Sequence, residues 1–189
     1  MPRSFVLLAV TLVAATMAFG QAPSHEPWPE LKKLEYFLGD WFEEADVKAG
    51  PQGSGGRVTM HDHREWMDGG FFLIIRSEFT ALKEDGTGIS FMGYDPNAKV
   101  YTYDEFYSQG EVDHSTGHIE GDQWIWNMND RKLGSQMVKA RYRVKIVSPT
   151  FYMYQYETSS DGGKTWTLTM DGTGRKQSRA ASGVSQRIR

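Results

Sequence analysis

Two histidines and a glutamate recur at alternate positions, as His61, His63 and Glu65. Alternate residues of a β-strand face the same side, so two imidazoles with this spacing can share one metal ion. A zinc site needs a third protein ligand from a neighbouring strand, for which Glu78 is the nearest candidate. The surrounding charged residues make this strand polar on both faces, which is typical of a solvated surface. We therefore predict no metal site and no cofactor, and keep His61 and His63 as the only candidate metal ligands.

Two further histidines, His114 and His118, flank a Ser-Thr-Gly stretch. One of them could act as a general base near neutral pH if it faced a cavity, and a surface position is the alternative. The chain has no G-x-S-x-G nucleophile motif, no phosphate-binding glycine loop and no cysteine. We predict no catalytic residue, and keep an enzyme with a histidine-based metal or acid–base site as an alternative function.

Residues 159–166 match the pattern S-x-D-x-G-x-T-W, the Asp-box of sialidases and other β-propellers. The Ser and Asp161 side chains of such a turn bind its own backbone, and Trp166 packs beneath it. A propeller repeats this signal in each blade, whereas here it occurs once. The motif predicts a hairpin clasp, and a glycosidase propeller is excluded.

One helix and many short strands must position these residues. Pro29 suits the first position of a helix, Leu31, Leu34 and Leu38 share a face, and Gly39 is a natural stop. After this helix the apolar pattern has period two, with glycine-containing turns at short intervals. No helical pattern lies between the strands, which excludes parallel βαβ folds. The expected fold is all-β, an antiparallel up-and-down β-barrel of about 8–10 strands with a short N-terminal helix.

The C-terminal strands alternate between two kinds of face. Residues 138–146 have apolar side chains at even positions and basic ones at odd positions. The large side chains at 124, 126 and 128 alternate less cleanly, with Ile125 among the intervening residues. In residues 151–156, Met153 and Gln155 share one face and three tyrosines share the other. Pairing this strand with residues 165–171 across the Asp161 turn predicts the tyrosines outside, beside threonines. Met153 and Gln155 would then lie inside with Trp166 and Met170.

Large apolar side chains on these inward faces can either fill the barrel or line a malleable pocket. We expect them to line a pocket for a small, largely apolar molecule, and keep a structural or interaction protein with a filled barrel as an alternative. The candidate ligand-binding residues are Trp124, Trp126, Met128, Tyr142, Met153, Gln155, Trp166 and Met170.

The segment Gly39-Asp40-Trp41 follows the helix and opens the first strand. It resembles the Gly-x-Trp signature of lipocalins and their calycin relatives. That resemblance implies that Trp41 packs across the closed end of a barrel, beneath an arginine from near the last strand. Arg175 is the residue in the matching place, so Trp41 and Arg175 are the expected barrel closure.

Several turn motifs, taken in order, are similar to a lipocalin-like bacterial family known as domain of unknown function 1579. The resemblance implies a calycin β-barrel and supplies no catalytic residues. The matching pieces are 37–41 (Phe-Leu-Gly-Asp-Trp), 68–71 (Asp-Gly-Gly-Phe), 93–95 (Gly-Tyr-Asp), 108–110 (Ser-Gln-Gly), 120–122 (Glu-Gly-Asp) and 160–166.

The two ends of the chain differ from its body. Arg3, an apolar run and Ala18-Phe19-Gly20 have the form of a signal peptide with its cleavage site, so we predict an exported, periplasmic or secreted protein with no membrane insertion after cleavage. Residues 174–189 contain five basic and no acidic residues, within a chain of 21 Lys and Arg against 24 Asp and Glu. The body is therefore acidic, which argues against nucleic acid as a partner. We divide the chain into a signal peptide (1–20), a barrel domain (21–173) and a basic, disordered tail (174–189); nothing indicates the oligomeric state.

Overall fold

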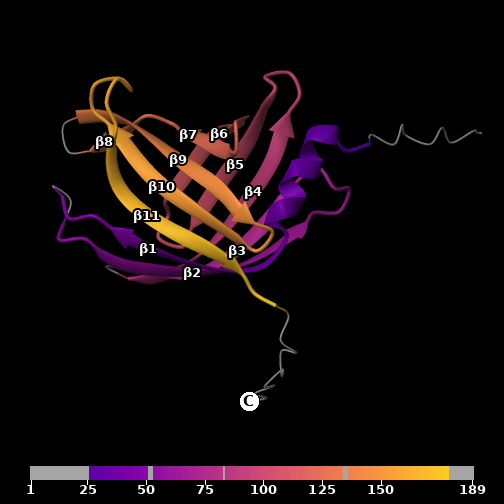
Figure 1. Ribbon diagram of the computed structural model, residues 1–189, viewed down its shortest axis with the longest axis horizontal. Helices are drawn as coiled ribbons and strands as arrows, with labels where there is room; N and C mark the ends of the chain where they lie inside the picture. Colours follow the sequence, from indigo (N-terminus) through magenta and orange to yellow (C-terminus); the bar gives the residue numbers. More distant parts are fainter. Residues whose placement is uncertain (1–25, 51–52, 83, 134–135, 179–189) are drawn as a thin grey trace, which may run out of the picture.

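The computed structural model of the protein describes residues 26–50, 53–82, 84–133 and 136–178. One short helix, η1 (Pro29–Phe37), precedes a set of antiparallel strands (Figure 1). The strands are β1 (Gly39–Val47), β2 (Gly56–Trp66), β3 (Leu73–Thr80), β4 (Asp85–Asp95), β5 (Val100–Tyr107), β6 (Val112–Glu120), β7 (Gln123–Met128), β8 (Arg131–Leu133), β9 (Gln136–Ser148), β10 (Phe151–Ser159) and β11 (Thr167–Lys176). The predicted signal peptide, residues 1–20, lies outside the described residues, as does most of the predicted tail.

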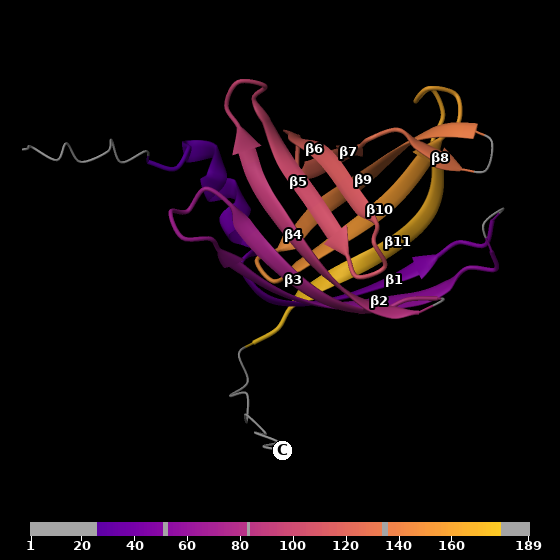
Figure 2. The ribbon, with the colours of Figure 1, turned by 180° about the vertical axis from the view of Figure 1, so that it is seen from behind.

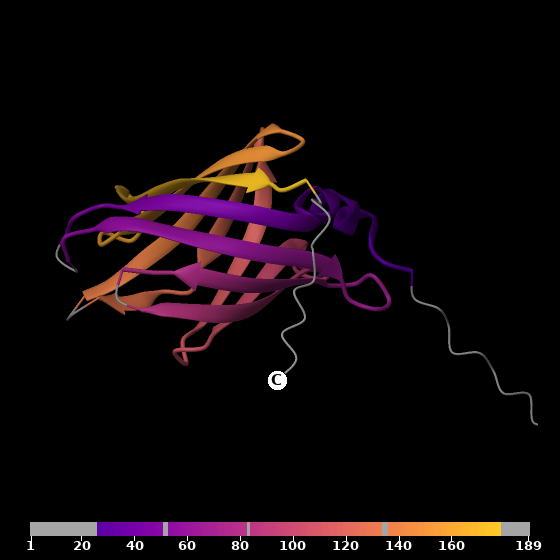
Figure 3. The ribbon, with the colours of Figure 1, turned by 90° about the horizontal axis from the view of Figure 1, so that it is seen from below.

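Ten of these strands close into a barrel (Figure 3). They follow the order β10-β11-β1-β2-β3-β4-β5-β6-β7-β9, and the pairing of β9 with β10 joins the two edges of the sheet. The short β8 pairs with β9 alone and extends it into a hairpin outside the ring. The prediction of an antiparallel barrel with a short N-terminal helix is confirmed.

The helix lies against one end of the barrel (Figures 1 and 2). It is a 3₁₀ helix, and its buried residues Leu31, Leu34 and Phe37 recur every third position. That spacing puts all three on one face of a helix with three residues per turn. Gly39 has a φ of 97°, a conformation that favours glycine, and it turns the chain from the helix into β1.

The barrel half beneath this helix is filled with aromatic and aliphatic side chains, and we call it the filled half. Trp41 is 1% exposed, and its indole N–H donates to the Phe37 carbonyl at 2.9 Å. Trp124 and Trp126 stack with ring centroids 5.7 Å apart. Phe37 packs edge-on against Trp124, so helix and barrel share one core. The buried core residues are Leu31, Leu34, Phe37, Leu73, Ile75, Met92, Tyr101, Trp124 and Trp126.

The faces of β10 are the reverse of those predicted. Tyr152 is buried against Trp41 and Phe37, whereas Met153 is 51% exposed. The physical reason lies on β11, where Gly172 and Gly174 pair with Tyr154 and Tyr152. Any Cβ at these two glycines would stand within 2.7 Å of the tyrosine rings, so the missing side chains make the room that the inward rings occupy.

Candidate ligand-binding interior

The half of the barrel away from η1 has an interior of a different kind, and we call it the open half. On one side, β2 to β6 turn small polar and acidic side chains inward. Asp62 pairs with Ser77 across β2 and β3, Ser90 pairs with Glu105 across β4 and β5, and Ser115 follows on β6. All five are at most 7% exposed. We call this surface the polar wall, and its residues are Asp62, Ser77, Ser90, Glu105 and Ser115.

Tyrosines form the facing side. Tyr142 on β9 and Tyr154 and Tyr156 on β10 turn inward, with the Tyr142 and Tyr156 ring centroids 4.7 Å apart. Tyr103 and Tyr107 join them from β5, beside the polar wall. All five tyrosines are half-buried. A side chain that faces the barrel axis and keeps accessible surface borders space that solvent can enter, so this half is not filled.

Glu105 is the most unusual group in the open half. It is 6% exposed, and the Tyr107 hydroxyl donates to its Oε1 at 2.8 Å. Among the residues that the structure describes, no Arg, Lys or His forms an ion pair with it. Burial raises the pKa of Glu105 from 4.5 to about 7, against the opposing effect of the Tyr107 hydrogen bond. The Glu105 carboxyl therefore changes from its protonated to its ionised form near neutral pH.

Two other polar atoms of the polar wall have no partner within the described chain. They are Ser115 Oγ, on a residue 1% exposed, and Asp62 Oδ1, on a residue 5% exposed. A buried polar atom that stays unbonded costs free energy, and native proteins satisfy nearly all such atoms with protein, water or ligand. Within the described chain these two atoms are therefore available to a water molecule or to a ligand.

A buried ion cluster separates the two halves. Arg64, 5% exposed, donates to Asp62 Oδ2 at 2.6 Å and to the Tyr152 hydroxyl at 3.1 Å, and it also binds Glu43. Burial raises the pKa of Glu43, while Arg64 opposes that rise. The Arg64 guanidinium lies 5.4 Å from the centre of the Trp41 ring.

This cluster corrects the predicted barrel closure. Trp41 does pack at the closed end, but Arg175 lies over Phe151, 4.4 Å from its ring centre and on the outer face. Arg175 pairs with Phe42, and Phe42 alternates with the inward Trp41 and therefore faces out. Arg64 is the arginine that covers Trp41, and Lys176 approaches the same ring from the last strand at 5.7 Å.

At the rim, Arg131 of β8 binds Asp113 of β6 and donates to the Tyr156 hydroxyl at 3.3 Å. This arginine is thus already paired with a carboxylate. It ties the β8 hairpin to the tyrosines of the open half.

The predicted ligand-binding residues lie in three places. Trp124 and Trp126 face inward but belong to the filled half, and Met128 is buried on the same strand face. Tyr142 and Met170 face the open half, the latter between Tyr156 and Val47. The last group, which lies on the outer face of the barrel, consists of Met153, Gln155 and Trp166. The Arg141 guanidinium lies 3.9 Å from the centre of the Trp166 ring.

Trp166 belongs instead to the clasp predicted at residues 159–166. Asp161 accepts hydrogen bonds from the Thr165 hydroxyl at 2.6 Å and from the backbone N–H of Lys164 at 2.9 Å. These bonds, with the Thr165 hydroxyl first, hold the pKa of Asp161 well below its usual range. Trp166 lies against Gly163, where a Cβ would stand 3.5 Å from the indole.

The histidines of the described chain all lie on outward faces. His63 Nδ1 is 2.6 Å from Asp40 Oδ1, and His61 stacks on Phe42. His114 contacts Asp104 on the outer face of β5 and β6, and His118 is exposed. No cluster of three or more His, Cys, Asp or Glu side chains with a metal-binding arrangement occurs among the described residues. Within the same residues, no helix has the length and apolarity needed to cross a bilayer.

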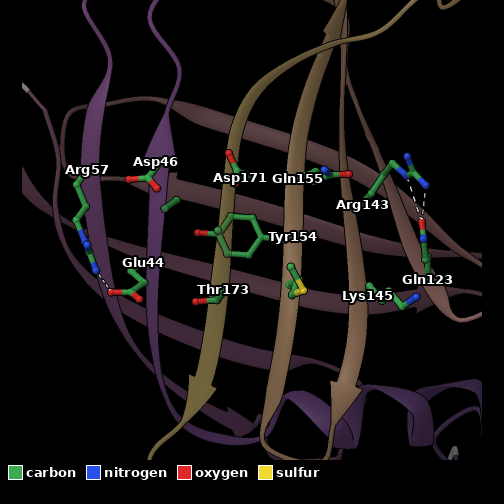
Figure 4. Close-up of a pocket in the computed structure, with 13 residues that line it drawn as sticks. Glu44, Asp46, Arg57, Gln123, Arg143, Lys145, Tyr154, Gln155, Asp171 and Thr173 are labelled. Carbon is green, nitrogen blue, oxygen red and sulfur yellow. Dashed lines mark hydrogen bonds and ion pairs between the residues drawn. The ribbon is translucent and has the colours of Figure 1, made fainter.

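The outer surface carries two shallow grooves, of about 340 and 530 Å³. Figure 4 shows the first, which spans β2, β1, β11, β10 and β9. Most of its charged side chains already have a polar partner, since Arg57 binds Glu44 and Arg143 donates to Gln123 at 2.8 Å. In the first groove Asp171 is paired with Lys48, and the buried Asp62 that borders the second groove belongs to the polar wall, so the interior is the stronger candidate site.

Sequence reasoning missed Glu105 and the polar wall. A signal was present, since Tyr101, Tyr103, Glu105 and Tyr107 occupy alternate positions of β5. Three tyrosines sharing a face with a single carboxylate indicate an inward face that is not purely apolar.

Comparison with known proteins supports the architecture. The family model described as "Protein of unknown function (DUF1579)" matches residues 26–176. The crystal structure of Rv2717c from M. tuberculosis is similar, with a TM-score of 0.53 and 12% identity over 80% of this chain and 99% of that one. The S-type phycobiliprotein lyase CPES from Guillardia theta has a TM-score of 0.48 and 11% identity over 78% of this chain and 92% of that one. No curated protein matches this sequence. At 12% identity the likeness to Rv2717c concerns the fold alone.

Proposed function

Because the chain belongs to the DUF1579 family, whose description assigns no activity, we propose from the site itself that the protein binds a small molecule inside the open half of its barrel. The observation that carries the proposal is the pairing of two surfaces. The polar wall has buried atoms without partners, and the tyrosines that face it are half-buried. Small barrels commonly hold one ligand in such an interior.

The chemistry of the two surfaces defines the ligand. Aromatic rings favour a flat apolar or aromatic body, while Glu105, Asp62 and Ser115 accept hydrogen bonds from a donor group. The expected ligand is therefore amphipathic, more polar than the largely apolar molecule that the strand patterns predicted.

A fluorescent probe tests this proposal. The probe is 1-aminoanthracene, which combines an aromatic body with an amine donor and is neutral at pH 7. We expect its emission to rise and to saturate at one molecule per barrel.

Two methionine substitutions locate the probe. Met170 faces the open half, whereas Met153 is on the outer surface. Met170→Trp should crowd the interior and weaken probe binding about tenfold or more, and Met153→Trp should leave it unchanged. Circular dichroism and urea midpoints check that both variants fold. Equal affinity in all three proteins, or no binding, would favour the filled-barrel alternative.

Export belongs to the same proposal and rests on the sequence of residues 1–20. The mass of the intact protein from the cell-envelope fraction should match a chain that begins near Gln21. A full-length mass from the cytosol would contradict export and leave the binding proposal standing.

A further inference from the structure

We propose that the ligand of the open half is an organic cation, an amine whose ammonium group binds the Glu105 carboxylate between the polar wall and the tyrosines. This inference rests on the proposed function and adds the chemical class of the ligand. It depends on three features of the interior, namely its charge pairing, its aromatic faces and its free acceptors.

The charge pairing leaves one inward carboxyl unmatched. Arg64 binds Asp62 and Glu43, and Arg131 binds Asp113. Arg64 at the boundary and Arg131 at the rim of the open half are therefore both already paired with carboxylates. Glu105 pairs with Asp113 in the strand register but has no cation of its own within the described residues. A buried carboxylate is costly unless a cation accompanies it, so a ligand cation is the complementary charge.

The aromatic faces suit the same ligand. Tyr103 and Tyr107 flank Glu105 on its own strand face, and Tyr142 faces it from β9. A cation is attracted to the face of a tyrosine ring, and more strongly where water is excluded. A neutral ligand can stack on these rings but gains no cation–π attraction and no ion pair with Glu105.

Free acceptors complete the site. Tyr107 donates to Glu105 Oε1, and Tyr103 also contacts this carboxyl. An ionised carboxylate has about four lone-pair sites, so it can still accept from an ammonium N–H. Ser115 Oγ, on the neighbouring strand, is buried and bonds no other residue that the structure describes. An ammonium has three donors and no acceptor, so it matches a wall made of acceptors.

Proton linkage gives the inference a second readout. Because burial raises the pKa of Glu105 to about 7, the carboxylate that binds the cation forms as the pH rises through neutrality. Other charged and titratable groups face Glu105 and act on it, although Arg131 and Asp113 offset one another. The facing groups are Tyr103 and Tyr107 on β5, Asp113 on β6, Arg131 on β8, Tyr142 on β9 and Tyr156 on β10.

The experiment compares two probes of one shape by titration calorimetry. 2-Naphthylmethylammonium carries a positive charge, and 2-naphthylmethanol carries a neutral hydroxyl in its place. The variants are Glu105→Gln, which removes the charge inside, and Asp104→Asn, which removes the neighbouring charge outside, where Asp104 contacts His114.

We expect wild type and Asp104→Asn to bind the ammonium more tightly than the alcohol, with affinity rising about tenfold between pH 6 and pH 8. Glu105→Gln should lose about tenfold or more for the ammonium, lose the pH dependence, and keep its affinity for the alcohol. Equal binding of the two probes, or an ammonium affinity that Glu105→Gln does not change, would overturn the cation inference while 1-aminoanthracene binding stands. If none of the three probes binds, the proposed function and the inference fail together.

Discussion

The filled half and the open half of this barrel are built by the same strands, yet their interiors follow opposite rules. Beneath η1, Trp41, Trp124 and Trp126 are at most 3% exposed, Trp124 stacks on Trp126, and Trp41 packs against Tyr152. Farther along the barrel, the inward side chains include serines, carboxylates and half-buried tyrosines beside a few methionines. A structural protein needs only the first kind of interior. The second kind places buried polar atoms where no other described residue bonds them, which is the basis of the proposed ligand binding.

The boundary between the halves is the Arg64 cluster. It covers Trp41 on one side and carries Asp62, the first residue of the polar wall, on the other. Stability should therefore depend on the filled half and on this cluster, and binding on the open half.

The largest expected effect on stability comes from breaking the boundary cluster. Arg64→Met leaves the Asp62 and Glu43 carboxyls buried without a cation, which should lower the free energy of unfolding by about 3–5 kcal/mol. The matched control is Arg175→Met on the outer face, where a loss of about 1 kcal/mol or less is expected from its contact with Phe151. Urea denaturation measures both. Similar losses in the two variants would mean that Arg64 does not close the barrel.

A smaller effect is expected from the pH dependence of Glu105. Unfolded, this carboxyl loses its proton near pH 4.5, and folded it keeps the proton to about pH 7. The folded state thus binds more protons in that window, so the free energy of unfolding should fall by about 3 kcal/mol as the pH rises from 4.5 to 7 and level off above. Glu105→Gln should abolish this fall of about 3 kcal/mol in the free energy of unfolding between pH 4.5 and 7. A pH profile unchanged by the substitution would place Glu105 in contact with water.

The smallest effect compares one glycine from each half. A Cβ at Gly117 would stand 2.5 Å from the Trp126 ring, whereas at Gly88 the nearest atom, on Tyr107, is 3.3 Å away. Gly117→Ala should cost about 1–3 kcal/mol, because the filled half cannot shift. Gly88→Ala should stay within about 0.5 kcal/mol of wild type, since the open half has room. Thermal melts can rank the two, and the reverse order would contradict the division into halves.

The sequence predicted what depends on period and position. The alternation of apolar and polar residues predicted the strands of the barrel, and the spacing of the leucines predicted η1. The segment Gly39-Asp40-Trp41 predicted the closed end. The sequence did not predict properties that depend on pairing between distant strands. The tyrosines of β10 turn inward because Gly172 and Gly174 on β11 make room for Tyr154 and Tyr152, which no pattern within β10 reveals.

The candidate site was predicted less well for the same reason. Arg64 can be buried because the carboxyls of both Glu43 and Asp62 pair with its charge. Glu43 lies on a different strand, so the sequence around Arg64 does not reveal this pairing. From the sequence alone Arg64 is one charge in a polar strand, whereas Arg175 has the position that the lipocalin resemblance implies. The inward direction of Tyr142 and Met170 was predicted correctly, because apolar and polar residues alternate clearly around them.

The most direct test of binding in the open half is methyl NMR of protein labelled at its methionines, before and after saturation with 1-aminoanthracene. Met170 and Met60 face the open half, while Met67, Met137 and Met153 are 46–58% exposed on other surfaces. Signals are assigned by single substitutions to leucine. We predict that the probe shifts the Met170 and Met60 signals and leaves the three exposed methionines unchanged. Shifts confined to the exposed methionines, or no shift at all, would contradict binding inside the barrel.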